Sequence, residues 1–264
     1  MTRIDKRFAQ LKPENRKAMI PYVTAGDPTL EITLDLVFAL ERAGADVIEL
    51  GVPFSDPIAD GPVIQRATER ALAAGATIRK VLRLGSEIRA KSEIPLLLFS
   101  YYNPILNYGL ERLARDAAAA GFDGVLATDL TVEESDEYRR SMQNAGLNTV
   151  FLVAPTSSPE RIEKIAAASS GFLYAVSRTG VTGKQQEVAS DLKTFLQALR
   201  THTRLPIAVG FGISTPEHVR AVWQEADGAI VGSAIVKCVE EHIGSTDLAE
   251  RVGEFAAWLK GSKQ

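Results

Sequence analysis

The amino-acid sequence predicts a single (β/α)8 barrel, an α/β fold of the TIM-barrel class, with an N-terminal helix and extra helices beyond the repeating units. Three observations predict this class. Eight short apolar segments recur along the 264 residues, and a helical pattern follows each of them. These segments are continuously apolar, which indicates a parallel sheet covered on both faces. The length suits one barrel, and no linker divides residues 1–264, so we expect one domain.

Local patterns justify the elements in order. Residues 2–11 are predicted to form a short amphipathic helix, because Ile4, Phe8 and Leu11 fall on one face. Thr29 is a suitable cap for the next helix. The strands are expected at residues 18–24, 47–50, 95–101, 124–127, 149–153, 171–176, 206–209 and 229–231. Further helices are expected from Val63 onward, over 77–90 as an addition to the barrel, and over 234–241.

A similar phrase precedes four of the predicted strands. Its copies are Ala43-Gly-Ala-Asp46, Ala120-Gly-Phe-Asp123, Ala145-Gly-Leu-Asn148 and Glu225-Ala-Asp-Gly228. Each copy is expected to be a helix that ends at or near glycine, a tight turn and then a buried strand, as a repeated βα unit requires.

A doubly wound open sheet is the alternative fold. It predicts fewer strands and usually a glycine-rich dinucleotide-binding turn after the first strand. The turn here is Thr24-Ala-Gly-Asp-Pro28, which lacks that pattern.

Composition and charge argue against several classes of protein. The chain is 45% hydrophobic and 24% charged, which is ordinary for a soluble globular protein. A net charge of −3 gives no electrostatic reason to expect nucleic acid or a membrane as partner. No apolar run reaches transmembrane length, and the first residues lack a signal-peptide core.

Cysteine and histidine are scarce. A single cysteine, Cys238, excludes an internal disulfide and indicates a reducing compartment, so we expect a cytoplasmic protein. The three histidines, His202, His218 and His242, do not pair at metal-ligand spacing. We therefore expect no metal site and no histidine-based triad.

The stretch from residue 47 to residue 62 contains the first candidate catalytic groups. Glu49 interrupts an apolar strand, and a buried carboxylate must be neutral, paired or facing a cavity. The loop that follows contains three prolines, two glycines and the acids Asp56 and Asp60. Enzymes of this class place general acid and base groups at such strand ends. The structural alternative is a salt-bridged Glu49 with Asp56 and Asp60 capping turns.

Glycine-rich turns follow the last three predicted strands. They are Gly180-Val-Thr-Gly183, Gly210-Phe-Gly212 and Gly232-Ser233, the last at the start of a predicted helix. Glycines let backbone N–H groups approach a ligand, and a helix N-terminus favours a phosphate. An ordinary turn would explain any one of them alone, but three in adjacent loops favour a phosphate site.

Apolar and aromatic residues lie at the carboxyl ends of the predicted strands, at the same end of the barrel as these turns. They are Tyr22, Phe99, Tyr101, Leu126, Tyr174 and Phe211. Packing in the upper layer of the barrel is the structural alternative for each. Together they suit a flat aromatic part of a substrate, with its phosphate at one end. An apolar wall beside Glu49 would raise the pKa of that carboxyl and keep it available as a proton donor.

These motifs together resemble the alpha subunit family of tryptophan synthase, from the first strand to the C-terminal helix. The stretches that carry the resemblance are Pro-Tyr-Val-Thr-Ala-Gly-Asp-Pro28, Ile-Glu-Leu-Gly-Val-Pro-Phe-Ser-Asp-Pro-Ile-Ala-Asp-Gly-Pro62, Tyr-Tyr-Asn-Pro104, Ser-Arg-Thr-Gly-Val-Thr-Gly183, Val-Gly-Phe-Gly-Ile213 and Val-Gly-Ser-Ala234. The second is the most specific.

The resemblance implies a lyase that splits indole-3-glycerol phosphate into indole and glyceraldehyde 3-phosphate by a retro-aldol reaction. By position, Glu49 resembles the carboxylate that protonates indole C3, and Asp60 resembles the one that accepts a hydrogen bond from the indole N–H. Thr182 resembles a threonine of the loop that closes over the site. The implied phosphate site comprises Gly183, Gly212, Gly232 and Ser233.

The resemblance also implies a partner. No cofactor is expected in this chain, and pyridoxal phosphate is expected only in a beta subunit that receives indole through a tunnel within an α2β2 heterotetramer. The implied contact surface comprises Pro53, Asp56, Asn103, Pro104 and Asp129. The chain departs from the family pattern where Thr128-Asp-Leu-Thr131 replaces Pro-Asp-Leu-Pro, and where Tyr22 replaces a frequent phenylalanine.

Three alternatives stay open at this point. The chain could act alone and release free indole, or it could activate a beta subunit without catalysis. The intact pair Glu49 and Asp60 argues against the second alternative. Another phosphate-binding barrel, such as a sugar-phosphate isomerase, would not need the loop from Phe54 to Asp60.

Overall fold

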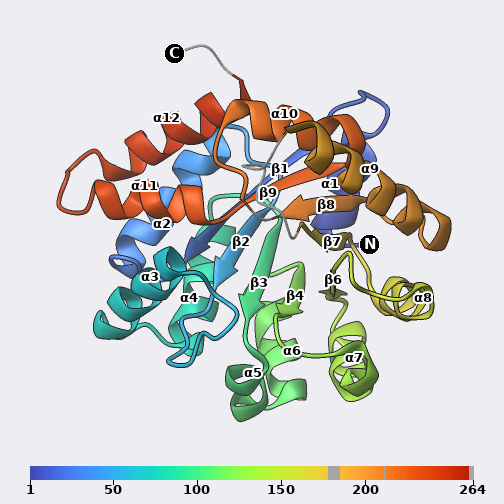
Figure 1. Ribbon diagram of the computed structural model, residues 1–264. Coiled ribbons are helices and arrows are strands. Elements are labelled where there is room, and N and C mark those ends of the chain that lie inside the picture. The colour runs from blue at the N-terminus through green and yellow to red at the C-terminus, as the bar shows by residue number, and fades with distance from the viewer. Residues whose placement is uncertain (178–184, 211, 262–264) are drawn as a thin grey trace.

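Parallel strands form the centre of the molecule, and helices surround them (Figure 1). The computed structural model describes residues 1–177, 185–210 and 212–261; the side chains of residues 185–190 are outside this description. The strands are β1 Ala18–Thr24, β2 Ile48–Gly51, β3 Leu96–Ser100, β4 Gly124–Ala127, β5 Asn148–Thr149, β6 Leu152–Val153, β7 Leu173–Val176, β8 Ile207–Gly210 and β9 Gly228–Val231. Their order in the sheet is β5-β4-β3-β2-β1-β9-β8-β7-β6.

The two ends of this order are two parts of one extended stretch. β5 pairs with β4, whereas β6, which begins three residues after β5 ends, pairs with β7. Between them, the Val150 N–H donates to Val125 O on the β4 side and Phe151 O accepts from the Tyr174 N–H on the β7 side. The sheet therefore closes, which confirms the predicted (β/α)8 barrel and excludes the open sheet. The fifth strand, predicted as one piece, is divided where its bonds change sides.

Helices cover the outside of the barrel and one of its ends. They are α1 Arg3–Leu11, α2 Leu30–Arg42, α3 Pro62–Ala73, α4 Ile78–Arg89, α5 Tyr102–Tyr108, α6 Leu110–Ala119, α7 Asp136–Asn144, α8 Pro159–Ala168, α9 Gln185–His202, α10 Pro216–Glu225, α11 Ser233–Glu241 and α12 Leu248–Lys260, with the short 3₁₀ helix η1 Val132–Glu134. The extra helix predicted at 77–90 is α4. Helix α5 was not predicted, because Pro104 interrupts its sequence; proline is tolerated in the first turn of a helix. Within the described chain, no helix has the length and apolarity needed to cross a membrane.

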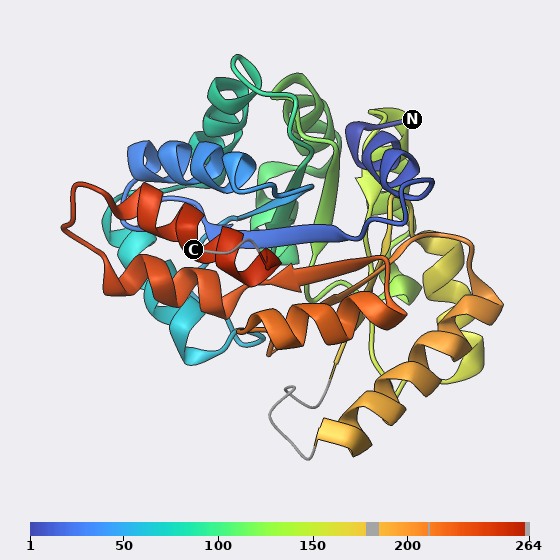
Figure 2. The same ribbon diagram turned by 90° about the horizontal axis from the view of Figure 1, so that it is seen from above.

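Helix α1 closes the end of the barrel where the strands begin. Its residues Ile4, Phe8 and Leu11 join the inner core with Phe172 and Leu97, as the amphipathic pattern predicted. Figure 2 shows this helix (dark blue) on the side of the barrel away from α11 and α12 (red). The barrel is thus plugged at one end by its own N-terminus.

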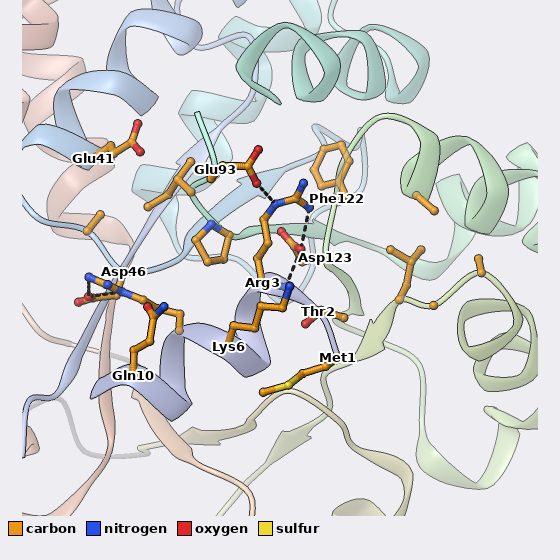
Figure 3. Close-up of a pocket in the computed structure, with 18 of the residues that line it drawn as sticks. Met1, Thr2, Arg3, Lys6, Gln10, Glu41, Asp46, Glu93, Phe122 and Asp123 are labelled. Atoms are coloured by element: carbon orange, nitrogen blue, oxygen red, sulfur yellow. Dashed lines mark hydrogen bonds and ion pairs between the residues drawn. The ribbon is translucent and has the colours of Figure 1, made fainter. Parts of the chain in front are cut away.

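A charged hollow of about 720 Å³ separates α1 from the turns that lead into the strands. Figure 3 shows Arg3 reaching from α1 to Glu93 and Asp123, at 2.6 Å and 3.2 Å between nitrogen and oxygen. Arg7 binds Asp46 at 2.6 Å. The buried acids of this hollow are therefore already paired with arginines, and they hold α1 against the barrel.

The recurring phrase of the sequence explains the starts of the strands. Three of its copies place an aspartate whose carboxylate accepts the backbone N–H of a residue at the start of the preceding strand. These bonds link Asp46 to Met19, Asp123 to Leu96 and Asp227 to Ile207, each at 2.9 Å. Gly44 and Gly121 have φ of 90° and 85°, the left-handed region that a tight turn after a helix requires. The phrase is therefore both a turn and a clamp between neighbouring βα units.

Candidate active site

A cavity of about 350 Å³ opens at the carboxyl ends of the strands, opposite the end closed by α1. Eight of the residues predicted to form the site line it: Tyr22, Glu49, Asp60, Phe99, Tyr174, Gly212, Gly232 and Ser233. They come from four strands, three loops and the first residue of α11, which are distant in the sequence. The barrel thus brings together the acids, the aromatic residues and two of the glycine-rich turns.

Glu49 is buried at the wall of this cavity. It lies on β2 between Tyr22 of β1 and Leu97 of β3, and its exposed fraction is 1%. Neither carboxylate oxygen has a hydrogen-bond partner in the described part of the chain. Burial raises the pKa of Glu49 from its ordinary 4.5 to about 8. The side chain is therefore protonated at neutral pH and can donate a proton into the cavity.

Asp60 lies in a different environment. It is half-buried, and burial raises the pKa of this carboxyl, while a hydrogen bond from the Tyr101 hydroxyl at 3.1 Å opposes the rise. The Gln65 side chain donates to Asp60 O at 2.9 Å, which anchors the loop to the first turn of α3. One acid without a partner and one acid with a hydrogen-bond donor therefore share the cavity, and two different environments suit two different catalytic roles.

Aromatic side chains form the walls around Glu49. The rings of Tyr22 and Phe99 meet edge to face, with centroids 5.2 Å apart. Burial raises the pKa of both Tyr22 and Tyr174 far above their ordinary value, so both phenols are neutral. A Cβ atom at Gly51 would overlap the Tyr22 hydroxyl, which explains why glycine is needed there. The walls are apolar with neutral hydroxyl groups at the edge, a setting that suits a planar aromatic ligand.

The far end of the cavity is built to receive an anion. Gly232 precedes the first turn of α11 and has no side chain with which to cap this helix. The first turn of α11 contains no acidic residue. Within the described residues, the N–H groups of this turn and the positive end of the helix dipole therefore remain available to a ligand. Gly212 has a φ of 72° and lines the same end, where backbone can approach a ligand closely.

Comparison with known proteins agrees with this geometry. Residues 8–261 match the family model described as "Tryptophan synthase alpha chain". The chain belongs to the tryptophan synthase alpha chain family.

Relatives of this family are similar over almost their whole length. The tryptophan synthase alpha chain of Solibacter usitatus is 56% identical over 260 residues, which cover 98% of this chain and 97% of the relative. That of Geotalea uraniireducens is 51% identical, with the same coverage. The crystal structure of tryptophan synthase subunit alpha from Legionella pneumophila str. Paris superimposes with a TM-score of 0.91 at 40% identity, covering 99% of this chain and 98% of that chain. A structure of the tryptophan synthase complex from Pyrococcus furiosus superimposes with a TM-score of 0.84 at 38% identity, covering 92% of this chain and 97% of that chain.

Two residues predicted to bind substrate in this alpha chain lie outside the cavity lining. Leu126 is fully buried in the inner core, and the Tyr101 hydroxyl contacts the Asp60 carboxylate. Their roles in binding stay predictions. Three further predicted residues, Thr182, Gly183 and Phe211, lie outside the described residues.

The predicted partner residues follow β2, β3 and β4, at the same end of the barrel as the cavity. Asp56, Asn103 and Asp129 are exposed, and Pro104 is half-buried. Pro53 is buried, so it offers little surface. The segments after β3 and β4 are joined, because the Tyr102 N–H at the start of α5 donates to the Asp129 carboxylate at 2.6 Å.

Sequence reasoning missed the apolar floor and one side of the cavity. The additional lining residues are Gly61, Pro62, Val63, Ile64, Ile213 and Ile230. An apolar residue beside a glycine-rich turn is compatible with either a cavity or the core, so only the helix start at Pro62 could have indicated them. Among the described residues, no cluster of three or more His, Cys, Asp or Glu is placed to hold a metal ion.

Proposed function

We propose that this protein catalyses the retro-aldol cleavage of indole-3-glycerol phosphate to indole and glyceraldehyde 3-phosphate, as the alpha subunit of tryptophan synthase. Family membership supports the reaction. The observation that carries it is the cavity in which a neutral, buried Glu49 and a hydrogen-bonded Asp60 lie together with the uncapped start of α11.

In this proposal Glu49 is the proton donor. Its proton goes to C3 of the indole, which creates an indolenine-like ring with positive charge at the nitrogen. Asp60 accepts a hydrogen bond from the ring N–H and stabilises that charge. The bond between C3 and the side chain then breaks, and its electron pair returns to the ring. Positioned acid–base groups contribute about 10²–10⁴-fold each.

The same step releases the aldehyde. As the bond breaks, the hydroxyl on the adjoining side-chain carbon loses its proton and becomes the carbonyl of glyceraldehyde 3-phosphate. Glu49 is a carboxylate after its donation, so we assign it this second transfer as well. It then returns to the protonated form that burial favours, and the cycle needs no other acid or base.

The remaining residues bind and orient the substrate in this proposal. Tyr22, Phe99 and Tyr174 hold the indole ring, and Gly212, Gly232 and Ser233 hold the phosphate through backbone N–H groups. Thr182, Gly183 and Phe211 keep the roles expected from the sequence. Water exclusion by the surrounding loops would strengthen the charge interactions at Asp60.

We further propose that the chain works as one domain, without a cofactor of its own, in an α2β2 assembly. A protonated carboxyl and a carboxylate are sufficient for the proton transfers described. The pyridoxal phosphate belongs to the beta subunit in this proposal. The exposed residues Asp56, Asn103 and Asp129 share the end of the barrel that holds the cavity, so a partner there is suitably placed to receive indole.

Indole release from indole-3-glycerol phosphate by the purified chain tests the proposal, with and without a pyridoxal-phosphate beta subunit. We expect slow release that the beta subunit accelerates. Rapid release that the beta subunit leaves unchanged would indicate a stand-alone lyase. Activation of the beta subunit without cleavage would indicate a non-catalytic partner, and Glu49→Gln serves as the inactive control.

A further inference from the structure

Tyr101 connects the proposed catalytic Asp60 to the loops that carry the predicted partner residues. It lies between β3 and α5, and its exposed fraction is 4%. Its hydroxyl accepts the Ala59 N–H at 2.9 Å and lies 3.1 Å from Asp60 Oδ2. In the described part of the chain, no other residue forms a hydrogen bond or an ion pair with the Asp60 carboxylate.

The two hydrogen bonds of the Tyr101 hydroxyl determine where its proton points. The Ala59 amide is a donor only, so the Tyr101 oxygen accepts there. The single proton of the phenol is consequently directed at Asp60 Oδ2. This oxygen must accept, which favours the carboxylate form of Asp60 and leaves Oδ1 free to accept from a ligand.

The same residue lies among three loops with predicted partner contacts. The ring of Phe54, next to Pro53 in the loop after β2, packs on the Tyr101 ring with centroids 5.3 Å apart. The neighbouring Tyr102 begins α5, and its N–H is bound by Asp129 of the loop after β4. A shift of α5 or of either loop therefore acts on Tyr101.

We propose that Tyr101 is a positioning residue of the cleavage reaction, which holds Asp60 with Oδ2 bound and Oδ1 directed at the substrate, and which links this alignment to the partner-facing loops. The inference rests on the proposed function, since it assigns Asp60 a role in that reaction. Its structural basis is the pair of bonds from one phenol to adjacent residues of the catalytic loop.

The groups around Asp60 determine how loss of the Tyr101 hydroxyl would change the pKa of Asp60. Glu49 of β2, Tyr22 of β1 and Tyr174 of β7 face the same cavity, and all three are neutral at neutral pH. Tyr101 is thus the group that lowers the pKa of Asp60 against the effect of burial. Without the Tyr101 hydroxyl, the pKa of Asp60 rises. As the pH falls, Asp60 is then protonated at a higher pH than in the wild type.

The test compares Tyr101→Phe with Tyr108→Phe. Tyr108 is the last residue of α5, the helix that begins directly after Tyr101, and its hydroxyl also donates to a carboxylate, that of Asp116 at 2.7 Å. Each variant therefore loses one phenol–carboxylate bond, but only one of them at the site. The kinetic constants for indole release are measured against pH, with and without the beta subunit.

For Tyr101→Phe we expect kcat to fall about tenfold or more, as for loss of a hydrogen bond to a charged group. KM should stay within about twofold, the acid limb of the pH profile should move to higher pH, and acceleration by the beta subunit should weaken. Tyr108→Phe should match the wild type. An unmoved acid limb, or a change in KM alone, would overturn the proposal.

A second measurement does not need turnover. Carbon-13 NMR of labelled aspartate, assigned by difference from Asp60→Asn, should show a higher pKa for Asp60 in Tyr101→Phe than in the wild type. An equal pKa refutes the link even if the enzyme is active. Absent cleavage by the wild type with a shifted pKa would refute the proposed function and leave the link intact. If Tyr101→Phe does not fold, a fluorotyrosine at position 101 alters the same bond, and an unchanged pKa would again refute the link.

Discussion

Arg70 on α3 binds Glu240 on α11, with 2.7 Å between its Nη1 and the carboxylate. Helix α3 follows the loop that contains Asp60, and α11 begins at the proposed phosphate site. Arg70 also binds the buried Asp27 in the turn after β1, at 2.7 Å. One guanidinium therefore connects the two helices that support the two ends of the proposed substrate.

Replacing Arg70 should both destabilise the fold and weaken substrate binding. Arg70→Met leaves Asp27, whose exposed fraction is 3%, without its ionic partner, and we expect a loss of about 2–3 kcal/mol in the free energy of unfolding. KM for indole-3-glycerol phosphate should rise because α11 loses a bond to α3. Urea unfolding and steady-state kinetics measure the two effects.

Arg66→Met is the matched control, because Arg66 binds the same Glu240 from a half-exposed position on α3. An exposed pair of this kind contributes little to stability, so Arg66→Met should unfold close to the wild type. Equal losses of stability in the two variants would contradict the role assigned to the buried Asp27.

The buried Glu49 should make stability fall as pH rises. The folded chain raises the pKa of Glu49 from 4.5 to about 8, so between these values the folded state binds a proton that the unfolded state has released. This contribution is complete below pH 4.5 and is lost up to about pH 8, at about 1.4 kcal/mol per pH unit. Glu49→Gln should unfold with a flatter dependence on pH in urea titrations between pH 5 and 8.

The raised pKa of Glu49 also predicts how activity falls at alkaline pH. Cleavage requires the protonated acid, so kcat should decline above about pH 8 in the wild type.

The stability measurement has its own contradicting outcome. Parallel pH dependences of stability in the wild type and Glu49→Gln would show that Glu49 is not a buried neutral acid.

The acids could be predicted from the sequence, whereas the apolar lining could not. A carboxylate such as Glu49 inside an apolar strand has few structural explanations, so its position alone indicates a cavity or a buried pair. Ile213 and Ile230 fit the core equally well, and only the closed barrel shows that they face the cavity. Phe99 and Leu126 are opposite each other in strand register, yet only Phe99 lines the cavity. Strand tilt and stagger decide between them, and these depend on closure of the whole sheet.

The fold shows the same division between local and long-range information. Turn glycines such as Gly44 and Gly121 could be predicted because their backbone angles are a local property. The second function of the recurring phrase, the bond from Asp46 to Met19, joins residues 27 positions apart. Sequence periodicity carries no information on a contact at that distance.

Asp60→Asn should separate binding from chemistry. The amide keeps the size of the side chain but loses the charge that stabilises the indole ring in the proposed reaction. We expect kcat to fall about 10²-fold or more, with the affinity for glycerol phosphate unchanged. Calorimetry with glycerol phosphate and single-turnover indole release measure the two quantities. Loss of affinity with intact turnover would mean that Asp60 serves the phosphate end.

Asp46→Ala should affect stability and leave the site intact. Asp46 is fully buried, accepts the Met19 N–H and binds Arg7 of α1, so its removal leaves a buried donor and a cation without partners. We expect a loss of about 3–5 kcal/mol in the free energy of unfolding. Because Asp46 lies at the end of the barrel opposite the cavity, KM and kcat of the folded variant should match the wild type. Asp136→Ala, which removes a carboxylate that is 83% exposed and paired with Arg139, should cost less than about 1 kcal/mol. A large fall in kcat for folded Asp46→Ala would show that the two ends of the barrel are coupled, and the separation of stability from catalysis would be wrong.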